Sequence, residues 1–230
     1  MEKETYSFRN TRIAQAILAL HKVYEEIEEA EGAWMSACPV HCIDGCGMCC
    51  VHFEPDLYEV EALYLAAWML CHQRERALQI MAGNFNENVL DKDRGCLLFD
   101  IDNRYHCTVY GGRALICRLF GYSGDRGKDL KIRWRPCKYL TSGNAENSFV
   151  KKNYDEASLI AGFGTTPPVM SDFTLRILGI MPESLSQTSP MRKALPAAIA
   201  KILMLEKYSL FCEFEPDMDP ETPPTQPLAS

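Results

Sequence analysis

The sequence lacks the features that mark several common protein classes. No apolar run approaches the roughly 18 residues that a membrane-spanning helix needs. Positive charge is not in excess, because 24 Lys and Arg residues stand against 31 Asp and Glu residues. The resulting net charge of −7 disfavours a broad nucleic-acid surface, which is normally basic. The charged start, Met1 to Tyr6, has no apolar centre of the signal-peptide kind. These absences predict a cytoplasmic protein with no membrane span and no nucleic-acid partner.

Familiar catalytic motifs are also missing. The chain has no Gly-rich phosphate loop, no Ser-His-Asp ordering, no HExxH pair and no evident internal repeat. The sequence therefore nominates no catalytic residue, and it leaves the substrate and the oligomeric state open.

Cysteine, in contrast, is plentiful, with eleven residues in a chain of 230. Disulfides belong to oxidising compartments, and an odd count without an export signal does not favour a disulfide framework. In a reducing compartment a Cys-dense segment is typical of metal binding or redox chemistry. Thiolates are strong ligands for zinc, iron and iron–sulfur clusters.

Four of the thiols lie within nine residues, at Cys42, Cys46, Cys49 and Cys50. Cys46 to Cys49 is a CxxC knuckle whose glycine can take a tight turn. Because Cys49 and Cys50 are adjacent, we expect their side chains to diverge, which favours two metal centres over one.

Four later cysteines lie at expected strand ends or turns and bring the candidate ligands to eight, enough for two tetrahedral sites. The eight are Cys42, Cys46, Cys49, Cys50, Cys96, Cys107, Cys117 and Cys137. Three histidines that flank cysteines, His41, His52 and His106, are alternative ligands, although such residues more often lie exposed or support a ligand.

Hydrophobic periodicity predicts an α+β protein that is mainly helical, with a small Cys-rich core containing a short antiparallel sheet. The helical pattern predicts a first helix over residues 11–31, ended by Gly32, and a second over 55–83. A last helix is capped by Ser189 and is either kinked at Pro196 or begins there. Strand patterns cover 96–99 and 105–110, joined by 100–104 as a hairpin, and 130–134 leading to Cys137. The glutamates between Glu25 and Glu31 are interpreted as a solvated acidic face.

Four segments follow from this pattern. We expect an N-terminal helix over 1–33, a cysteine-cluster metal-binding domain over 34–140, and a helical part over 141–212 that packs on it. The segment 213–230, rich in Pro and acidic residues, is predicted to be a disordered tail.

The order of these motifs resembles the YkgJ-type CxxCxxCC family of zinc- or iron-chelating cysteine-cluster domains, over roughly residues 38–140. The resemblance rests on the Cys42–Cys50 cluster and four later motifs, which are Phe53-Glu54-Pro55-Asp56 with Glu59 and Glu61, Cys96-Leu97-Leu98, Cys107-Thr108-Val109-Tyr110, and Arg113-Ala114-Leu115-Ile116-Cys117-Arg118-Leu119-Phe120, followed by Cys137. Cys42 and Cys46 have the spacing Cys-x₃-Cys, whereas the family has Cys-x₂-Cys at this place. Cys38 is therefore an alternative to Cys42 as a metal ligand. Ala114 and Gly121 replace prolines of the family.

The resemblance implies metal binding, and in some relatives lysine N-methylation of flagellin. The irregular spacing of the first cysteines favours an iron–sulfur cluster or iron over zinc. We therefore expect a redox role with an unknown protein or redox partner, and an iron–sulfur oxidoreductase or a protein lysine methylase if the protein is an enzyme. A zinc-stabilised structural or interaction module is the alternative. Arg113 and Arg118 are expected to stand behind the ligands and offset thiolate charge, unless they are ordinary surface arginines.

One further pattern match is disfavoured. Cys42-x₃-Cys46-x₂-Cys49 is also the spacing that holds the cluster of radical S-adenosylmethionine enzymes. Those enzymes are built on a repeated strand–helix barrel, and residues 51–230 show no such alternation.

Overall fold

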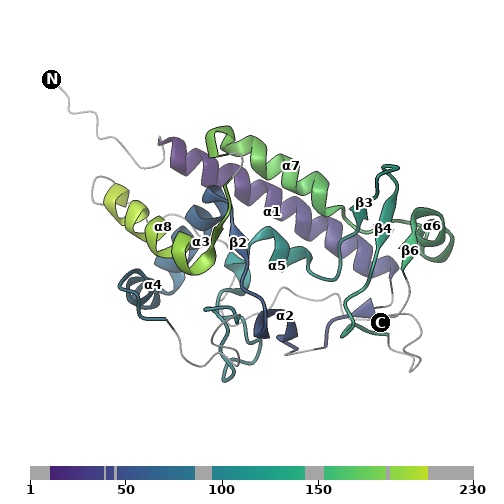
Figure 1. Ribbon diagram of the computed structural model, residues 1–230, viewed down its shortest axis with the longest axis horizontal. Helices are drawn as coiled ribbons and strands as arrows, with labels where there is room; N and C mark the ends of the chain where they lie inside the picture. The colour runs from purple at the N-terminus through teal and green to yellow at the C-terminus, as the bar shows by residue number, and fades with distance from the viewer. Residues whose placement is uncertain are drawn as a thin grey trace.

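The computed structural model describes residues 11–38, 40–43, 46–85, 95–142, 153–184 and 187–206. Within them the chain is mainly helical with small antiparallel sheets, so the predicted α+β class is confirmed (Figure 1). The helices are α1 (Arg12–Ala37), α2 (Met48–Val51), α3 (Glu59–His72), α4 (Arg74–Met81), α5 (Leu115–Leu119), α6 (Glu156–Phe163), α7 (Met170–Ile180) and α8 (Met191–Glu206), with 3-10 turns η2 (Tyr110–Gly112) and η3 (Pro182–Ser184). The strands are β1 (Val40–His41), β2 (Asp56–Leu57), β3 (Asp125–Arg126), β4 (Ile132–Trp134), β5 (Thr141–Ser142), β6 (Tyr154–Asp155) and β7 (Ser189–Pro190).

Helix α1 is the long element against which α3, α5 and α7 pack (Figure 1). The side chain of Thr11 caps it by accepting a hydrogen bond from the backbone N–H of Ala14 at 3.1 Å. The predicted end at Gly32 is wrong, because the helix continues to Ala37. Trp34 explains the extension, since its ring is buried against Trp134 with centroids 5.1 Å apart.

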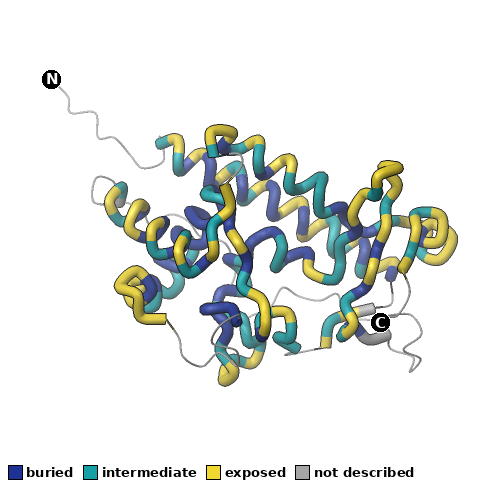
Figure 2. Tube along the Cα trace, in the orientation of Figure 1, coloured by how far each residue is buried: buried dark blue, intermediate teal, exposed yellow. Residues whose placement is uncertain are grey.

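The main hydrophobic core lies where α3 packs on α1 and α8, and α4 also packs on α8 (Figure 2). The single helix predicted over 55–83 is two helices, α3 and α4, which meet at Gln73. The side chain of Gln73 donates to the carbonyl of Thr108 at 2.5 Å. This contact between distant parts of the chain leaves Gln73 with non-helical dihedral angles and breaks the helix.

The N-terminus of α8 differs from its predicted cap. Ser189 and Pro190 form strand β7, which pairs antiparallel with Asp56 and Leu57 of β2. The cap is provided instead by Glu54, whose carboxylate accepts the backbone N–H of Arg192 at 3.0 Å. Pro196 lies within α8 and does not end it.

A second, smaller core lies at the other end of α1. It contains Trp34, Cys38, Trp134, Leu140 and Leu159 and is covered by the three-stranded sheet β3-β4-β6. Strand β4 agrees with the predicted strand before Cys137. Two further strand pairs, β1-β5 and β2-β7, are antiparallel as well.

The hairpin predicted over 96–110 is wrong. Only one isolated bridge, Phe99 with Cys107, forms there. The link between them folds into turns, because the side chains of Asp100 and Asn103 accept the backbone N–H groups of residues two positions later. His106 then takes a left-handed conformation with φ of 57°, which no extended strand allows.

The predicted disordered tail, 213–230, lies outside the described residues, as do parts of the predicted helical segment 141–212. Among the helices that the structure describes, none has the length and apolar character needed to cross a membrane.

Candidate metal centre

Six separate segments carry the eight predicted ligands. Cys42 and Cys46 lie in the loop after β1, and Cys49 and Cys50 lie in the one-turn helix α2. Cys96 lies before the turn at Phe99, and Cys107 forms the bridge to Phe99. Cys117 lies in α5, and Cys137 lies just after β4. All eight are free thiols in the structure.

The CxxC knuckle forms the tight turn that the sequence predicts. Gly47 has φ of 54° and opens α2, and the N–H of Cys50 donates to its carbonyl at 2.8 Å. A Cβ atom at position 47 would lie 2.5 Å from Cδ2 of His106, so the turn needs glycine for both conformation and space.

Cys49 and Cys50 do not diverge as expected, because their Sγ atoms lie 3.7 Å apart. Two thiolates bound to one tetrahedral ion at a metal–sulfur distance of about 2.3 Å would lie about 3.8 Å apart. The pair therefore has the spacing of two ligands of a single ion.

The thiols fall into two neighbouring sets. The first, which we call the knuckle set, comprises Cys42, Cys46 and Cys137, since Cys46 and Cys137 act electrostatically on Cys42, as does Cys49 of the second set. Burial is the main cause that raises the pKa of Cys42 to about 12. The hydroxyl of Tyr122 accepts the backbone N–H of Cys42 at 2.6 Å. Gly121 lies against Cys137, where an added Cβ would meet the Cys137 Cβ at 2.6 Å.

The second set, which we call the core set, surrounds the base of α2. It comprises Cys49, Cys50, Cys96, Cys107 and Cys117, which interact electrostatically with one another. The backbone N–H of Cys96 donates to the carbonyl of Cys50 at 2.9 Å, which ties two of its segments together.

Burial and hydrogen bonding separate the pKa values of the core thiols. A hydrogen bond from Cys50 lowers the pKa of Cys49 to about 7, and donating this bond raises the pKa of Cys50. Desolvation raises the pKa of Cys96 to about 12 and also raises the pKa values of Cys107 and Cys117. A bound cation would reverse this effect, because metal ligation releases thiol protons.

Arg113 lies beside the core set. Its guanidinium stacks 3.5 Å from the Tyr110 ring centroid and donates to the carbonyls of Tyr110 and Cys117 at 3.0 and 3.3 Å. Its positive charge lowers the pKa of Cys49, although a hydrogen bond from Cys50 has the larger effect. The arginine is therefore placed to offset thiolate charge.

Arg118 is buried, with 4% exposure, and so is not an ordinary surface arginine. It pairs with Glu28 of α1 at 2.6 Å and lies 4.1 Å from the Tyr24 ring centroid. It also donates to the carbonyl of Arg113 at 2.8 Å. Arg118 thus fixes α5 and the backbone of Arg113 to α1.

Two acidic residues also belong to this region. Glu61 was named in the sequence only as part of the family motif, and Glu31 was predicted to lie on the solvated face of α1, which its partial burial contradicts. Glu61 is 4% exposed and accepts hydrogen bonds from Tyr24 Oη and the backbone N–H of Leu115, at 3.1 and 2.8 Å. Burial raises the pKa of Glu31 to about 7, although Arg113 acts to lower it. Residues so far apart in sequence give no local signal of these contacts.

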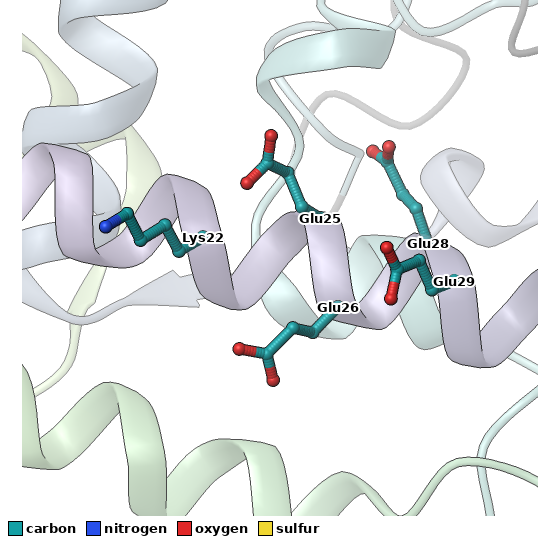
Figure 3. Close-up of a pocket in the computed structure, with 5 residues that line it drawn as sticks. All are labelled: Lys22, Glu25, Glu26, Glu28 and Glu29. Carbon is teal, nitrogen blue, oxygen red and sulfur yellow. The ribbon is translucent and has the colours of Figure 1, made fainter.

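The other glutamates of α1 agree with the predicted solvated face. Glu25, Glu26, Glu28 and Glu29 are exposed and, with Lys22, line an open hollow (Figure 3). Figure 3 shows the side chains of Glu25 and Glu26 pointing to different sides of the helix. Glu26 pairs with Arg176 of α7, and Glu28 pairs with Arg118.

The thiols suit zinc or iron in their chemistry, and the Cys49–Cys50 spacing suits one ion. Among the described residues, however, no group of three or more His, Cys, Asp or Glu side chains is already arranged to hold a metal ion. Binding of one ion at either set would therefore require its thiols to move closer together than they lie here.

Comparison with known proteins identifies the class. Residues 41–139 match the family model CxxCxxCC, described as a "putative zinc- or iron-chelating domain". This part of the chain is therefore similar to that family, in agreement with the resemblance seen in the sequence. No curated protein and no solved structure matches the chain significantly.

Proposed function

We propose that this protein binds metal through the two thiol sets, each holding a single thiophilic ion, zinc or iron. The proposal rests on the gathering of thiols from separate segments around α2, with Cys49 and Cys50 at the spacing of two ligands of one ion. The cysteine-cluster domain over 34–140, with the helices beyond it packed alongside, is the unit that would carry the ions.

The local structure supports a role in stabilising the fold. Residues 95–109 contain turns and one isolated bridge but no helix or longer strand. A segment that is held by turns instead of by a helix or a sheet gains stability when a metal joins it to neighbouring segments. Cys107 is one partner of that bridge and Cys96 precedes the other, Phe99, so an ion there would clamp the segment onto α2.

Paired variants test this proposal. We expect Cys42→Ser with Cys46→Ser to remove one equivalent of metal, and Cys96→Ser with Cys107→Ser to remove another. Cys71→Ser, in α3 and outside both sets, is the control and should keep the wild-type content. Equal metal content in all three proteins would contradict the proposal.

Metal content also tests whether Cys38 or Cys42 is the ligand. Cys38 is buried beside Trp34 in the small core, where Cys42 and Cys137 also pack. Cys42 interacts with Cys46, Cys49 and Cys137, which supports Cys42 over Cys38 as the ligand. Cys38→Ala should therefore retain the metal that Cys42→Ser loses.

An iron–sulfur cluster with a redox role is the alternative that the cysteine spacing favours, and methyl transfer is the alternative that the resemblance suggests; neither is tested by the structure. Acid-labile sulfide and visible absorption after anaerobic purification would favour the cluster over single ions. Calorimetric binding of S-adenosylmethionine would favour methyl transfer, and absence of heat would count against it.

A further inference from the structure

The adjacent thiols of Cys49 and Cys50 form a pair on a backbone that the fold holds in place. Their Sγ atoms lie 3.7 Å apart on the one-turn helix α2. The N–H of Cys50 donates to the carbonyl of Gly47 at 2.8 Å, and the carbonyl of Cys50 accepts the N–H of Cys96 at 2.9 Å. The fold therefore fixes the backbone from which both sulfur atoms project.

This pair is poorly placed to close into a disulfide. The Cα atoms of neighbouring residues lie about 3.8 Å apart, whereas disulfides usually join Cα atoms that are about 4.4–6.8 Å apart. A bond between the two sulfurs would therefore require α2 to distort, against the hydrogen bonds that hold Cys50. The two thiols are close enough to act together, and their geometry disfavours oxidation to a disulfide.

The pair can also be reached from solvent. Cys49 is exposed and Cys50 is half-buried, whereas Cys96 is buried. A reagent that attaches to Cys49 meets the second thiol without leaving the protein. Because the second attachment is intramolecular, it increases the overall affinity by roughly 10²- to 10⁴-fold.

The number of thiols selects the kind of centre that fits without rearrangement. In the part of the chain that the structure describes, no three His, Cys, Asp or Glu side chains are gathered around one point. Zinc takes four ligands, so it would need other thiols to approach. A soft centre that already carries a third substituent needs only two sulfurs. Trivalent arsenic with one organic substituent has this valence, and thiolates prefer soft partners.

We propose that Cys49 and Cys50 form a chelating dithiol site for monosubstituted compounds of trivalent arsenic. An oxide of the type R–As=O reacts with the two thiols to give the dithiolate and one water molecule. Two arsenic–sulfur bonds form, the bond from arsenic to oxygen breaks, and both thiol protons leave with the oxygen. Arsenic stays trivalent, so no oxidant or reductant takes part. This site goes beyond the proposed binding of zinc or iron and does not depend on it.

Phenylarsine oxide is the probe for the first test. It is added at one equivalent to the reduced full chain after treatment with a chelator, with circular dichroism to confirm that the chain stays folded. We expect the intact mass to increase by that of phenylarsine oxide less one water. Iodoacetamide should then fail to modify Cys49 and Cys50 but should still modify Cys42 and Cys46. Excess dimercaptopropanol should remove the adduct, and a monothiol at equal thiol concentration should not.

Single substitutions test the chelate. Cys49→Ser and Cys50→Ser should each weaken binding of phenylarsine oxide by roughly 10²- to 10⁴-fold, because the second attachment is lost. Cys46→Ser, which removes the other thiol of the CxxC knuckle, is the matched control and should bind as the wild type does.

Three results would overturn the inference. These are arsenic that joins Cys46 to Cys49, absence of any adduct in the folded wild type, and a native pair already closed as a disulfide. Failure to bind zinc or iron would instead overturn the proposed function alone, because the arsenic adduct needs only the two adjacent thiols.

Discussion

The buried guanidinium of Arg118 pairs with the carboxylate of Glu28 across 2.6 Å, joining α5 to α1. The two partners differ in environment, because Arg118 has 3% side-chain exposure and Glu28 has 49%. Arg118 also donates to two backbone carbonyls, those of Gly111 and Arg113, so it serves several acceptors at once.

This asymmetry predicts unequal effects of removing each partner. We expect Arg118→Met to lower the free energy of unfolding by about 2–4 kcal/mol, because it leaves buried carbonyls without donors. Glu28→Gln should have a smaller effect, about 1 kcal/mol or less, because its carboxylate is half exposed. Urea unfolding measures both. Arg133→Met, in an exposed pair with Asp129, is the control and should change little. Equal effects of the Arg118 and Glu28 substitutions would contradict this account.

The raised pKa of Glu31 predicts how the stability of the protein depends on pH. Burial raises its pKa to about 7 in the folded protein, opposed by Arg113 and Arg118 and assisted by Glu28. The folded state therefore binds the proton more tightly than the unfolded state does. Its contribution to stability is fully present below the unfolded pKa, near 4.5, and is lost as pH rises to about 7.

Comparison of Glu31→Gln with the wild type at several pH values measures this contribution. We expect the variant to gain stability relative to the wild type as pH rises from 4.5 through 7, and this gain should level off above the folded pKa of Glu31. A stability difference that is constant over this range would show that Glu31 titrates normally.

Cys49 should be the most reactive thiol of the metal-free protein. It is exposed, and the hydrogen bond from Cys50 lowers its pKa to about 7. At pH 7 about half of such a thiol is ionised, against a few per cent of an ordinary thiol with a pKa near 8.5. Alkylation by iodoacetamide, followed by mass spectrometry, should therefore modify Cys49 first.

Cys50→Ala tests the cause of this reactivity. Without the donor, the alkylation of Cys49 at pH 7 should slow severalfold, because fewer thiolates form. Cys96 provides an internal reference, since it is buried and its pKa is raised to about 12. Alkylation of Cys96 before Cys49 would be incompatible with the described structure.

Glu54 couples helix α8 to the cysteine region. It binds the guanidinium of Arg192 through two nitrogen atoms, at 2.8 to 3.0 Å, and Arg192 also donates to the carbonyl of Gly95, next to Cys96. Glu54→Gln weakens this paired contact and should lower the free energy of unfolding by about 2 kcal/mol.

Hydrogen exchange locates this effect. The amide of Cys96 should exchange faster in Glu54→Gln than in the wild type, because the adjacent backbone loses its support. Lys201→Gln, which removes the more exposed pair with Glu59, is the control. Faster exchange confined to α8 would mean that Arg192 does not support the cysteine segment.

The sequence predicted the features that depend on local pattern. Apolar periodicity located α1, and strand alternation located β4, since each reports one buried face. The CxxC turn at Gly47 followed from glycine chemistry. The cysteine spacing also predicted the family whose model residues 41–139 match.

The features that the sequence missed depend on contacts between distant residues. The break between α3 and α4 involves Gln73 and Thr108, and the cap of α8 comes from Glu54, 138 positions away from Arg192. The extended pattern around Cys107 was misread because turns at Asp100 and Asn103 override strand propensity. Local patterns carry no information about such partners.

Metal and sulfide analysis of the full chain purified without oxygen tests the central claim most directly. We expect about two equivalents of zinc or iron per chain, with negligible acid-labile sulfide, if each thiol set holds one ion. Less than a tenth of an equivalent of any transition metal, both as purified and after addition of zinc or ferrous iron, would contradict the claim.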